Sequence, residues 1–174
     1  MRIETLSSVC APVALIGGFE LAAARQPSGY DSVRDTISAL AARGATDRWI
    51  MTVAFVVLGI CHLATAYGLR RPVLAVGGVA NVLLAFAPQP AQGSSTLHLA
   101  VAAVALTALA VWPVASPPHG RIAALVLVGL LLWFAVMLQV GAAVGLVERI
   151  LTAAEALWPI VAVRATHRLL AAQR

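Results

Sequence analysis

Six long apolar segments, separated by short stretches rich in Pro, Gly and Arg, constrain this chain more than any other feature of its sequence. The segments cover residues 7–24, 49–69, 73–87, 97–115, 122–140 and 146–163. A helix needs about 20 mainly apolar residues to cross the hydrocarbon core of a bilayer, and each segment approaches that length. The sequence therefore predicts an all-α polytopic membrane protein, with six transmembrane helices in a single domain over residues 1–174.

The composition supports a membrane location and argues against nucleic acid as a partner. The chain is 61% hydrophobic and 11% charged, whereas a soluble domain is about 45–50% apolar and about 25% charged. Too few charges remain to cover a globule of this size. All 12 basic residues are Arg, but they are scattered between the apolar segments and form no basic face of the kind that binds nucleic acid.

The distribution of Arg predicts the orientation of the chain. One side of a six-span topology carries seven Arg and a single acidic residue, namely Arg2, Arg70, Arg71, Arg121, Arg164, Arg168, Arg174 and Glu4. The other side carries five Arg and four carboxylates, namely Arg25, Arg34, Arg43, Arg48, Arg149, Asp31, Asp35, Asp47 and Glu148. Short loops with excess basic charge stay in the cytoplasm. We therefore expect both termini of this multi-pass membrane protein to be cytoplasmic.

The longest predicted loop, residues 25–48, faces outward and contains its own helical signal. Ser32 followed by Asp35 fits a capping box. Apolar residues then recur at helical spacing, at Val33, Ile37, Leu40 and Ala41. This pattern predicts a short amphipathic, interfacial helix that lies across the outer mouth of the bundle.

Polar residues concentrate in the outer half of the predicted spans and in the loop above them. The set consists of Glu20, Tyr30, Arg34, Asp35, Ser38, Asn81, His98, Gln139, Glu148, Arg149 and Glu155. Ionisable side chains at bilayer depth are costly, and they face the bundle interior or water. These residues are the candidate lining of an outer-leaflet pocket that binds a lipid headgroup or another amphiphile. In a second interpretation, compatible with the first, these residues neutralise one another and fasten the loop helix to the bundle. In both cases we expect carboxylates to hold Arg34 and Arg149 as a charged lid over Glu20 and Glu155, and this lid is the main physical support for the pocket.

The histidines and serines favour neither a cofactor nor catalysis. Haem needs two axial ligands at one depth, but His62 and His98 are separated by roughly 18 Å along the bilayer normal on this topology. We expect His62 to be structural and hydrogen-bonded within the bundle, beside Gly59 and Thr65. Ser38 or Ser95 with His98 and Asp35 could supply a hydrolytic triad, yet no nucleophile elbow is present. The sequence predicts no metal, no cofactor and no catalytic residue.

Several ordered motifs give the chain a family resemblance. They are the loop segment 29–40 (GYDSVRDTISAL), Gly59 with His62, Phe86 with Pro88 and His98, and the segment 145–150 (GLVERI) followed by Trp158. Together they resemble the bacterial membrane-protein family catalogued as domain-of-unknown-function family 998. The resemblance implies a six-helix inner-membrane protein, distantly similar to the FRAG, DRAM and Sfk membrane proteins, and it implies no activity.

These observations lead to a non-catalytic hypothesis. The chain is interpreted as a small integral membrane protein that binds membrane lipid, or that serves as an accessory subunit alongside other membrane proteins. One alternative is a transporter or channel, against which the inner half offers only His62 as a polar group. The other is a membrane enzyme that acts on a lipid or isoprenoid at the outer leaflet.

Overall fold

The computed structural model describes residues 2–116 and 118–173. Over these residues the chain is helical and has no strand. Its elements are α1 (Ile3–Ala23), α2 (Ile37–Leu40), α3 (Trp49–Leu69), α4 (Pro72–Phe86), α5 (Thr96–Val111), the 3-10 helix η1 (Trp112–Ala115), α6 (Gly120–Val140) and α7 (Val144–Ala172). The predicted all-α class is confirmed.

Four helical stretches are long and apolar enough to cross a bilayer: α1, α3, α5 continued by η1, and α6. Helix α4 is apolar but has only 15 residues, which is about 22 Å at 1.5 Å per residue. Helix α7 has 29 residues, but its sequence carries charged side chains along its length. The chain is thus a multi-pass membrane protein with four candidate spans and a shorter apolar helix.

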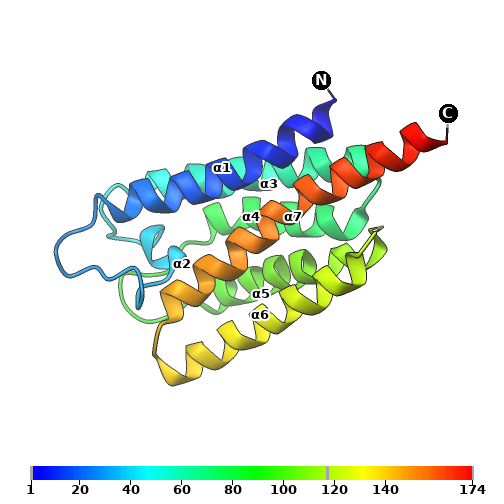
Figure 1. Ribbon diagram of the computed structural model, residues 1–174. Coiled ribbons are helices and arrows are strands. Elements are labelled where there is room, and N and C mark those ends of the chain that lie inside the picture. The colour runs from blue at the N-terminus through cyan, green and yellow to red at the C-terminus, as the bar shows by residue number, and fades with distance from the viewer. Residues whose placement is uncertain (1, 117, 174) are drawn as a thin grey trace.

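The six long helices form a closed ring in which neighbours in the chain are neighbours in space. Each helix packs against the next one in the chain: α1 against α3, α3 against α4, α4 against α5, α5 against α6, and α6 against α7. Helix α7 packs back against α1. Within this ring, α5 and α6 contact each other least. The chain alternates in direction, so its connections gather at two ends (Figure 1).

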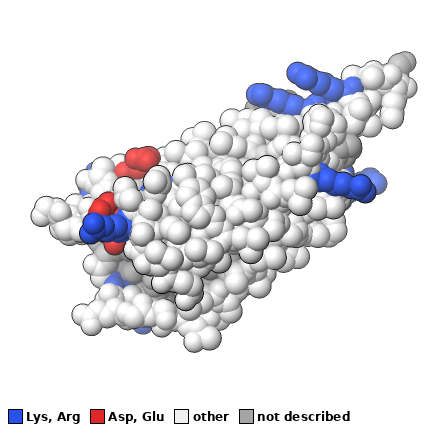
Figure 2. Space-filling view, turned by 60° about the horizontal axis from the view of Figure 1, so that its bottom comes forward, with Lys and Arg blue, Asp and Glu red and all other residues white. Residues whose placement is uncertain are grey.

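The two ends of the bundle differ in what they carry. The terminal end holds both chain termini, the α3–α4 turn and the α5–α6 connection, whereas the loop end holds residues 24–48, 87–95 and 141–143 (Figure 1). Figure 2 shows only basic groups at the terminal end, both signs at the loop end, and an uncharged surface between them. Large apolar side chains such as Leu125 and Leu132 are exposed on that surface, which suits contact with lipid.

The loop helix is shorter than predicted and begins later. Asp31 and Asp35 accept backbone N–H groups within the segment that the prediction placed in a helix: Asp31 Oδ1 from Val33 at 2.9 Å, and Asp35 Oδ2 from Asp31 at 2.8 Å. These side-chain bonds hold the segment in turns, because Asp competes with helical bonding. The cap of α2 is Thr36, whose Oγ1 accepts from the Ala39 N–H at 3.1 Å.

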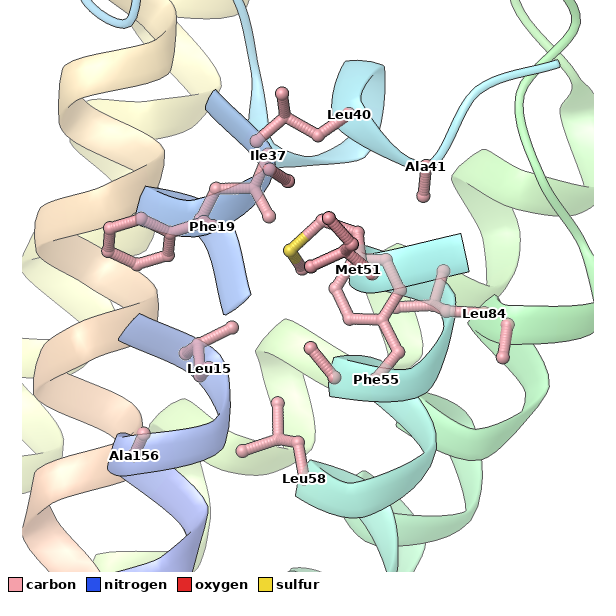
Figure 3. Close-up of a cluster of buried hydrophobic side chains, with 14 of the residues drawn as sticks. Leu15, Phe19, Ile37, Leu40, Ala41, Met51, Phe55, Leu58, Leu84 and Ala156 are labelled. Carbon is pink, nitrogen blue, oxygen red and sulfur yellow. The ribbon is translucent and has the colours of Figure 1, made fainter. Parts of the chain in front are cut away.

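Helix α2 is also buried rather than lying flat across the surface. Ile37 and Leu40 are fully enclosed, and Figure 3 shows them above Phe19 and Met51 in the main hydrophobic cluster. The buried apolar side chains gain more by filling the mouth of the ring than by resting at an interface. Helix α2 therefore plugs the loop end of the bundle.

Candidate functional site

Arg149 fastens the loop to the start of α7. Its Nη1 donates to the backbone carbonyls of Ser32 at 2.8 Å, Asp35 at 2.9 Å and Gly145 at 2.9 Å. Its Nη2 donates to the Tyr30 hydroxyl. The five donors of a guanidinium, which cannot lose its proton, match such a fork of oxygens. We call this set of contacts the clasp.

The clasp has two further supports around the guanidinium. The Arg149 guanidinium carbon lies 5.5 Å from the centre of the Phe19 ring, a cation–π distance. Burial raises the pKa of Tyr30, so its hydroxyl stays neutral and accepts from Arg149. The prediction that carboxylates hold Arg149 is wrong, because backbone carbonyls and a phenol already occupy its donors.

Gly145 allows the loop backbone to touch α7. The Leu146 N–H donates to the Val33 carbonyl at 3.1 Å, which brings the two backbones together. A Cβ atom at Gly145 would lie 2.1 Å from the Asp35 carbonyl oxygen, a distance that no side chain tolerates. In the sequence, Gly145 and Gly141 form a GxxxG pair that suggests helix packing, but what Gly145 admits is the loop.

A second polar group joins the plug to helices α5 and α7 through Ser38. Glu148 Oε2 accepts from the Ile37 N–H at 2.5 Å, and Glu148 Oε1 lies 3.4 Å from Ser38 Oγ. His98 Nε2 lies 3.1 Å from the same hydroxyl, while its Nδ1 lies 2.8 Å from the Ala87 carbonyl. The structure thus brings three residues that were predicted from the sequence into one hydrogen-bonded chain of side chains: Glu148, Ser38 and His98.

With Nδ1 of His98 facing a carbonyl, this hydrogen-bonded chain of side chains allows two arrangements with the same number of protons. A carbonyl only accepts, so Nδ1 of His98 carries a proton. In one arrangement His98 is neutral, Ser38 donates to Nε2, and a protonated Glu148 donates to Ser38. In the other, a cationic His98 donates to Ser38, which donates to the Glu148 carboxylate. The two arrangements contain the same number of protons and differ only in where the protons lie.

A pocket of about 380 Å³ opens between α5 and α6 beside this chain; we call it the side pocket. Its polar end is formed by Thr36, Ser38, Gln89, His98 and Glu148. Its remaining wall is formed by Leu99, Ala102, Ala103, Leu106, Thr107, Leu131, Phe134, Ala135 and Leu138. The side pocket therefore has a polar end at the loop end of the bundle and an almost entirely apolar body.

A smaller cavity of about 40 Å³ lies inside the ring; we call it the internal cavity. Its polar lining consists of Ser38, His62, Asn81, Glu148, Thr152 and Glu155. Ser38 and Glu148 line both spaces, so they separate the side pocket from the internal cavity. Asn81 Nδ2 donates to the Gly77 carbonyl at 3.1 Å. Among the described residues, neither His62 nor Glu155 has a hydrogen-bond partner.

The unpartnered imidazole contradicts one sequence expectation. His62 is completely buried, as predicted, but both of its ring nitrogens lack a partner within the described part of the chain. Thr65, its predicted neighbour, instead lies 2.7 Å from Ser7 Oγ. Thr65 thus bonds to a hydroxyl of α1 and not to His62, and the imidazole lines the internal cavity.

Three of the predicted pocket residues lie elsewhere. Glu20 and Gln139 are exposed. Arg34 is also exposed, and its Nε lies 3.6 Å from Asp31 on the surface. The predicted lid of Arg34 and Arg149 over Glu20 and Glu155 is therefore wrong, because position along a helix fixes depth but not the face on which a side chain lies.

The remaining predicted residues divide among three places. Tyr30, Asp35 and Arg149 belong to the clasp. Ser38, His98 and Glu148 form the polar end of the side pocket, and Asn81 and Glu155 line the internal cavity. Among the described residues, no group of three or more His, Cys, Asp or Glu could hold a metal ion.

Comparison with known proteins identifies a family without an assigned activity. The sequence model of the family described as "Protein of unknown function (DUF998)" matches residues 8–165. No curated protein and no solved structure matches the chain. The similarity to FRAG, DRAM and Sfk proteins stays a prediction. With nearly its whole length matched, the chain belongs to the DUF998 family.

Proposed function

We propose that this protein binds one amphiphilic molecule of the membrane in the side pocket, with the polar head at the loop end and the apolar part between α5 and α6. The observation that carries the proposal is the division of one pocket into a polar end and an apolar body. Its volume of about 380 Å³ falls within the range of about 300–1,000 Å³ usual for small-molecule sites.

The position of the side pocket suits access from the lipid. It opens between α5 and α6, the neighbouring pair of helices that contact each other least, and α6 has the most exposed surface of the four candidate spans. An acyl or isoprenoid chain can therefore slide between these helices from the bilayer. Because this apolar chain leaves one apolar environment for another, the specificity of binding comes from the polar end of the side pocket.

The polar end favours a hydroxyl or amine headgroup over a phosphate. Ser38, His98 and Glu148 offer hydrogen-bond donors and acceptors together with one carboxyl group. The nearby cation Arg149 has its donors committed to the clasp. A phosphate would meet the Glu148 carboxyl group without a free guanidinium, which is electrostatically unfavourable.

The contact of Ser38 with His98 supports a second candidate, a lipid esterase. A serine hydroxyl 3.1 Å from an imidazole, which is itself oriented by a carbonyl, has the geometry of a nucleophile and its base. Glu148 beside Ser38 argues against this activity, because its carboxylate form would repel the oxyanion that acyl transfer develops. Binding is the better-supported function.

Crosslinking to a defined lipid tests the binding proposal. Photoreactive diacylglycerol, which has a hydroxyl head, should label peptides of α5 and α6, and photoreactive phosphatidic acid should label them less. Ala103→Trp fills the side pocket and should abolish the labelling. Val104→Trp is the matched control, because the neighbouring Val104 is exposed and lies outside the pocket. Equal labelling of the two variants would refute the site.

The proposed topology has six spans with the terminal end in the cytoplasm. Helix α4 connects α3 to α5, and α7 returns the chain from the loop end to the terminal end (Figure 1); both are therefore placed across the membrane with the other four. Arg in the short connections of the terminal end supports the orientation. An impermeant thiol reagent applied to intact cells should label Ser94→Cys and spare Arg168→Cys. The reverse pattern would invert the topology.

A further inference from the structure

The internal cavity is lined by a carboxyl group and an imidazole that have no hydrogen-bond partner among the described residues. Glu155 and His62 are both completely buried, come from α7 and α3, and line the same space. Within the described residues neither has a hydrogen-bond partner. Such groups inside a membrane are costly and mark ion or proton pathways.

The internal cavity is large enough for water, and six of its 16 lining residues are polar. One water molecule needs a cavity volume of about 10–15 Å³ and two to four polar partners. The cavity offers about 40 Å³, enough for two or three water molecules, beside Glu155, His62 and Asn81. A short water chain would satisfy both unpartnered side chains at once.

Toward the loop end, the internal cavity meets the Glu148–Ser38–His98 chain. Glu148 is the one further titratable side chain that lines the internal cavity. Through Ser38, it connects to His98 at the polar end of the side pocket. The two proton arrangements of this chain allow a proton to pass along it.

Toward the terminal end, buried polar groups continue beyond His62. Thr65 follows one turn later on α3 and lies 2.7 Å from Ser7 Oγ. Glu4 lies one turn from Ser7 on α1, and its Oε1 is 3.0 Å from His167 Nε2. His167 is only part-buried. Polar side chains thus recur between His62 and the terminal end, with hydrogen bonds at Thr65–Ser7 and at Glu4–His167.

We propose that this succession of side chains is a proton path, and that the internal cavity is its hydrated central site. A proton from the Glu148–Ser38–His98 chain reaches Glu155 through cavity water. Glu155 passes a proton by the same water to one ring nitrogen of His62, and the imidazole releases a proton toward Thr65 and Ser7. Glu4 and His167 deliver it to the terminal end. One proton enters and one leaves; each carrier keeps its number of protons, and rotation of the hydroxyl groups and of the imidazole ring restores the starting arrangement.

Proton flux into liposomes tests the path directly. The purified full-length protein is reconstituted with a pH-sensitive dye inside, and a potassium gradient with valinomycin supplies the potential. Wild-type vesicles should show potential-driven proton uptake, and Glu155→Gln should reduce it to the level of protein-free vesicles. Glu20→Gln is the matched control, since Glu20 is an exposed carboxylate, and should keep the wild-type rate.

Two further measurements test the proton path and the hydration of the internal cavity independently. Thr65→Val keeps the side-chain shape but removes the hydroxyl, so it should also abolish flux. Infrared spectra should show a protonated-carboxyl band that is absent in Glu155→Gln and shifts when the wild type is moved into D₂O. A wild-type flux no greater than that of protein-free vesicles, or flux retained in Glu155→Gln or Thr65→Val, overturns the path. A Glu155 band insensitive to D₂O overturns the hydrated cavity.

Discussion

Glu148 and Glu155 lie two turns apart on α7, yet their surroundings are opposite. Glu148 accepts the Ile37 N–H and contacts Ser38, whereas Glu155 has no partner among the described residues. Both side chains are buried. Glu148 therefore holds the loop to α7 in addition to its place on the proposed proton path, whereas Glu155 adds no stabilising contact among the described residues and belongs to the proposed path alone.

The clasp should be the most sensitive part of the molecule. Arg149→Met removes the guanidinium and leaves three carbonyls and the Tyr30 hydroxyl without their donor. Removing one partner of a buried charged network costs about 3–5 kcal/mol. We expect that loss in the free energy of unfolding, measured by denaturant titration in micelles. Unchanged stability would mean that the clasp does not hold the loop.

The two carboxyl groups can be compared directly with one substitution. Glu148→Leu leaves the Ile37 N–H buried without an acceptor and should cost about 3 kcal/mol. Glu155→Leu removes an unpartnered polar group and should change stability by less than about 1 kcal/mol, because replacing such groups by apolar ones is often neutral. Similar losses from both would remove this distinction between the two carboxyl groups.

Gly145→Ala should loosen the loop without removing any hydrogen-bond donor or acceptor. The added methyl group would meet the Asp35 carbonyl oxygen at 2.1 Å, so the loop must shift away from α7. Overpacking of this kind costs about 1–3 kcal/mol, and we expect about 2. Proteolysis within residues 25–35 should become faster. Gly17→Ala is the control, because a Cβ there meets nothing within 4 Å.

Tyr30 should give the clasp a dependence on alkaline pH. Burial raises the pKa of Tyr30 in the folded state, so its contribution is complete below the unfolded value of about 10 and is lost as the pH rises through the folded value. Tyr30→Phe should cost about 1.5 kcal/mol at neutral pH, the lower edge for hydrogen bonds to charged groups. The difference between wild type and variant should shrink above pH 10. A constant difference would place Tyr30 outside the clasp.

The helices could be predicted because length and hydrophobicity act locally. The predicted segment 49–69 coincides with α3, and 73–87 differs from α4 by one residue at each end. The end of α7 could not be placed in the same way, because Arg164 and Arg168 stop the apolar segment but not the helix. The polar character of residues near the clasp and the side pocket was also visible in the sequence.

The faces of the helices could not be predicted, and the site depends on them. A uniformly apolar helix gives no periodic signal to show which side is buried. In the sequence, Ser7 and Thr65 look like ordinary small residues of apolar helices. Only the packing of α1 against α3 brings their hydroxyl groups within hydrogen-bonding distance. The i, i+3 series Gly59, His62 and Thr65 was the one available signal for the polar face of α3.

Substitution of Glu20 should have the smallest effect on stability, and it tests whether the helix face decides what a polar residue does. Sequence reasoning placed it under a charged lid with Glu155, where its loss would be costly. The structure instead leaves Glu20 exposed on α1, and surface substitutions change stability by no more than about 0.5 kcal/mol. Glu20→Gln should therefore unfold like the wild type, whereas a loss comparable to that of Glu148→Leu would return Glu20 to the bundle interior. Because both are Glu residues near the loop end, only the helix face on which each lies can account for the difference.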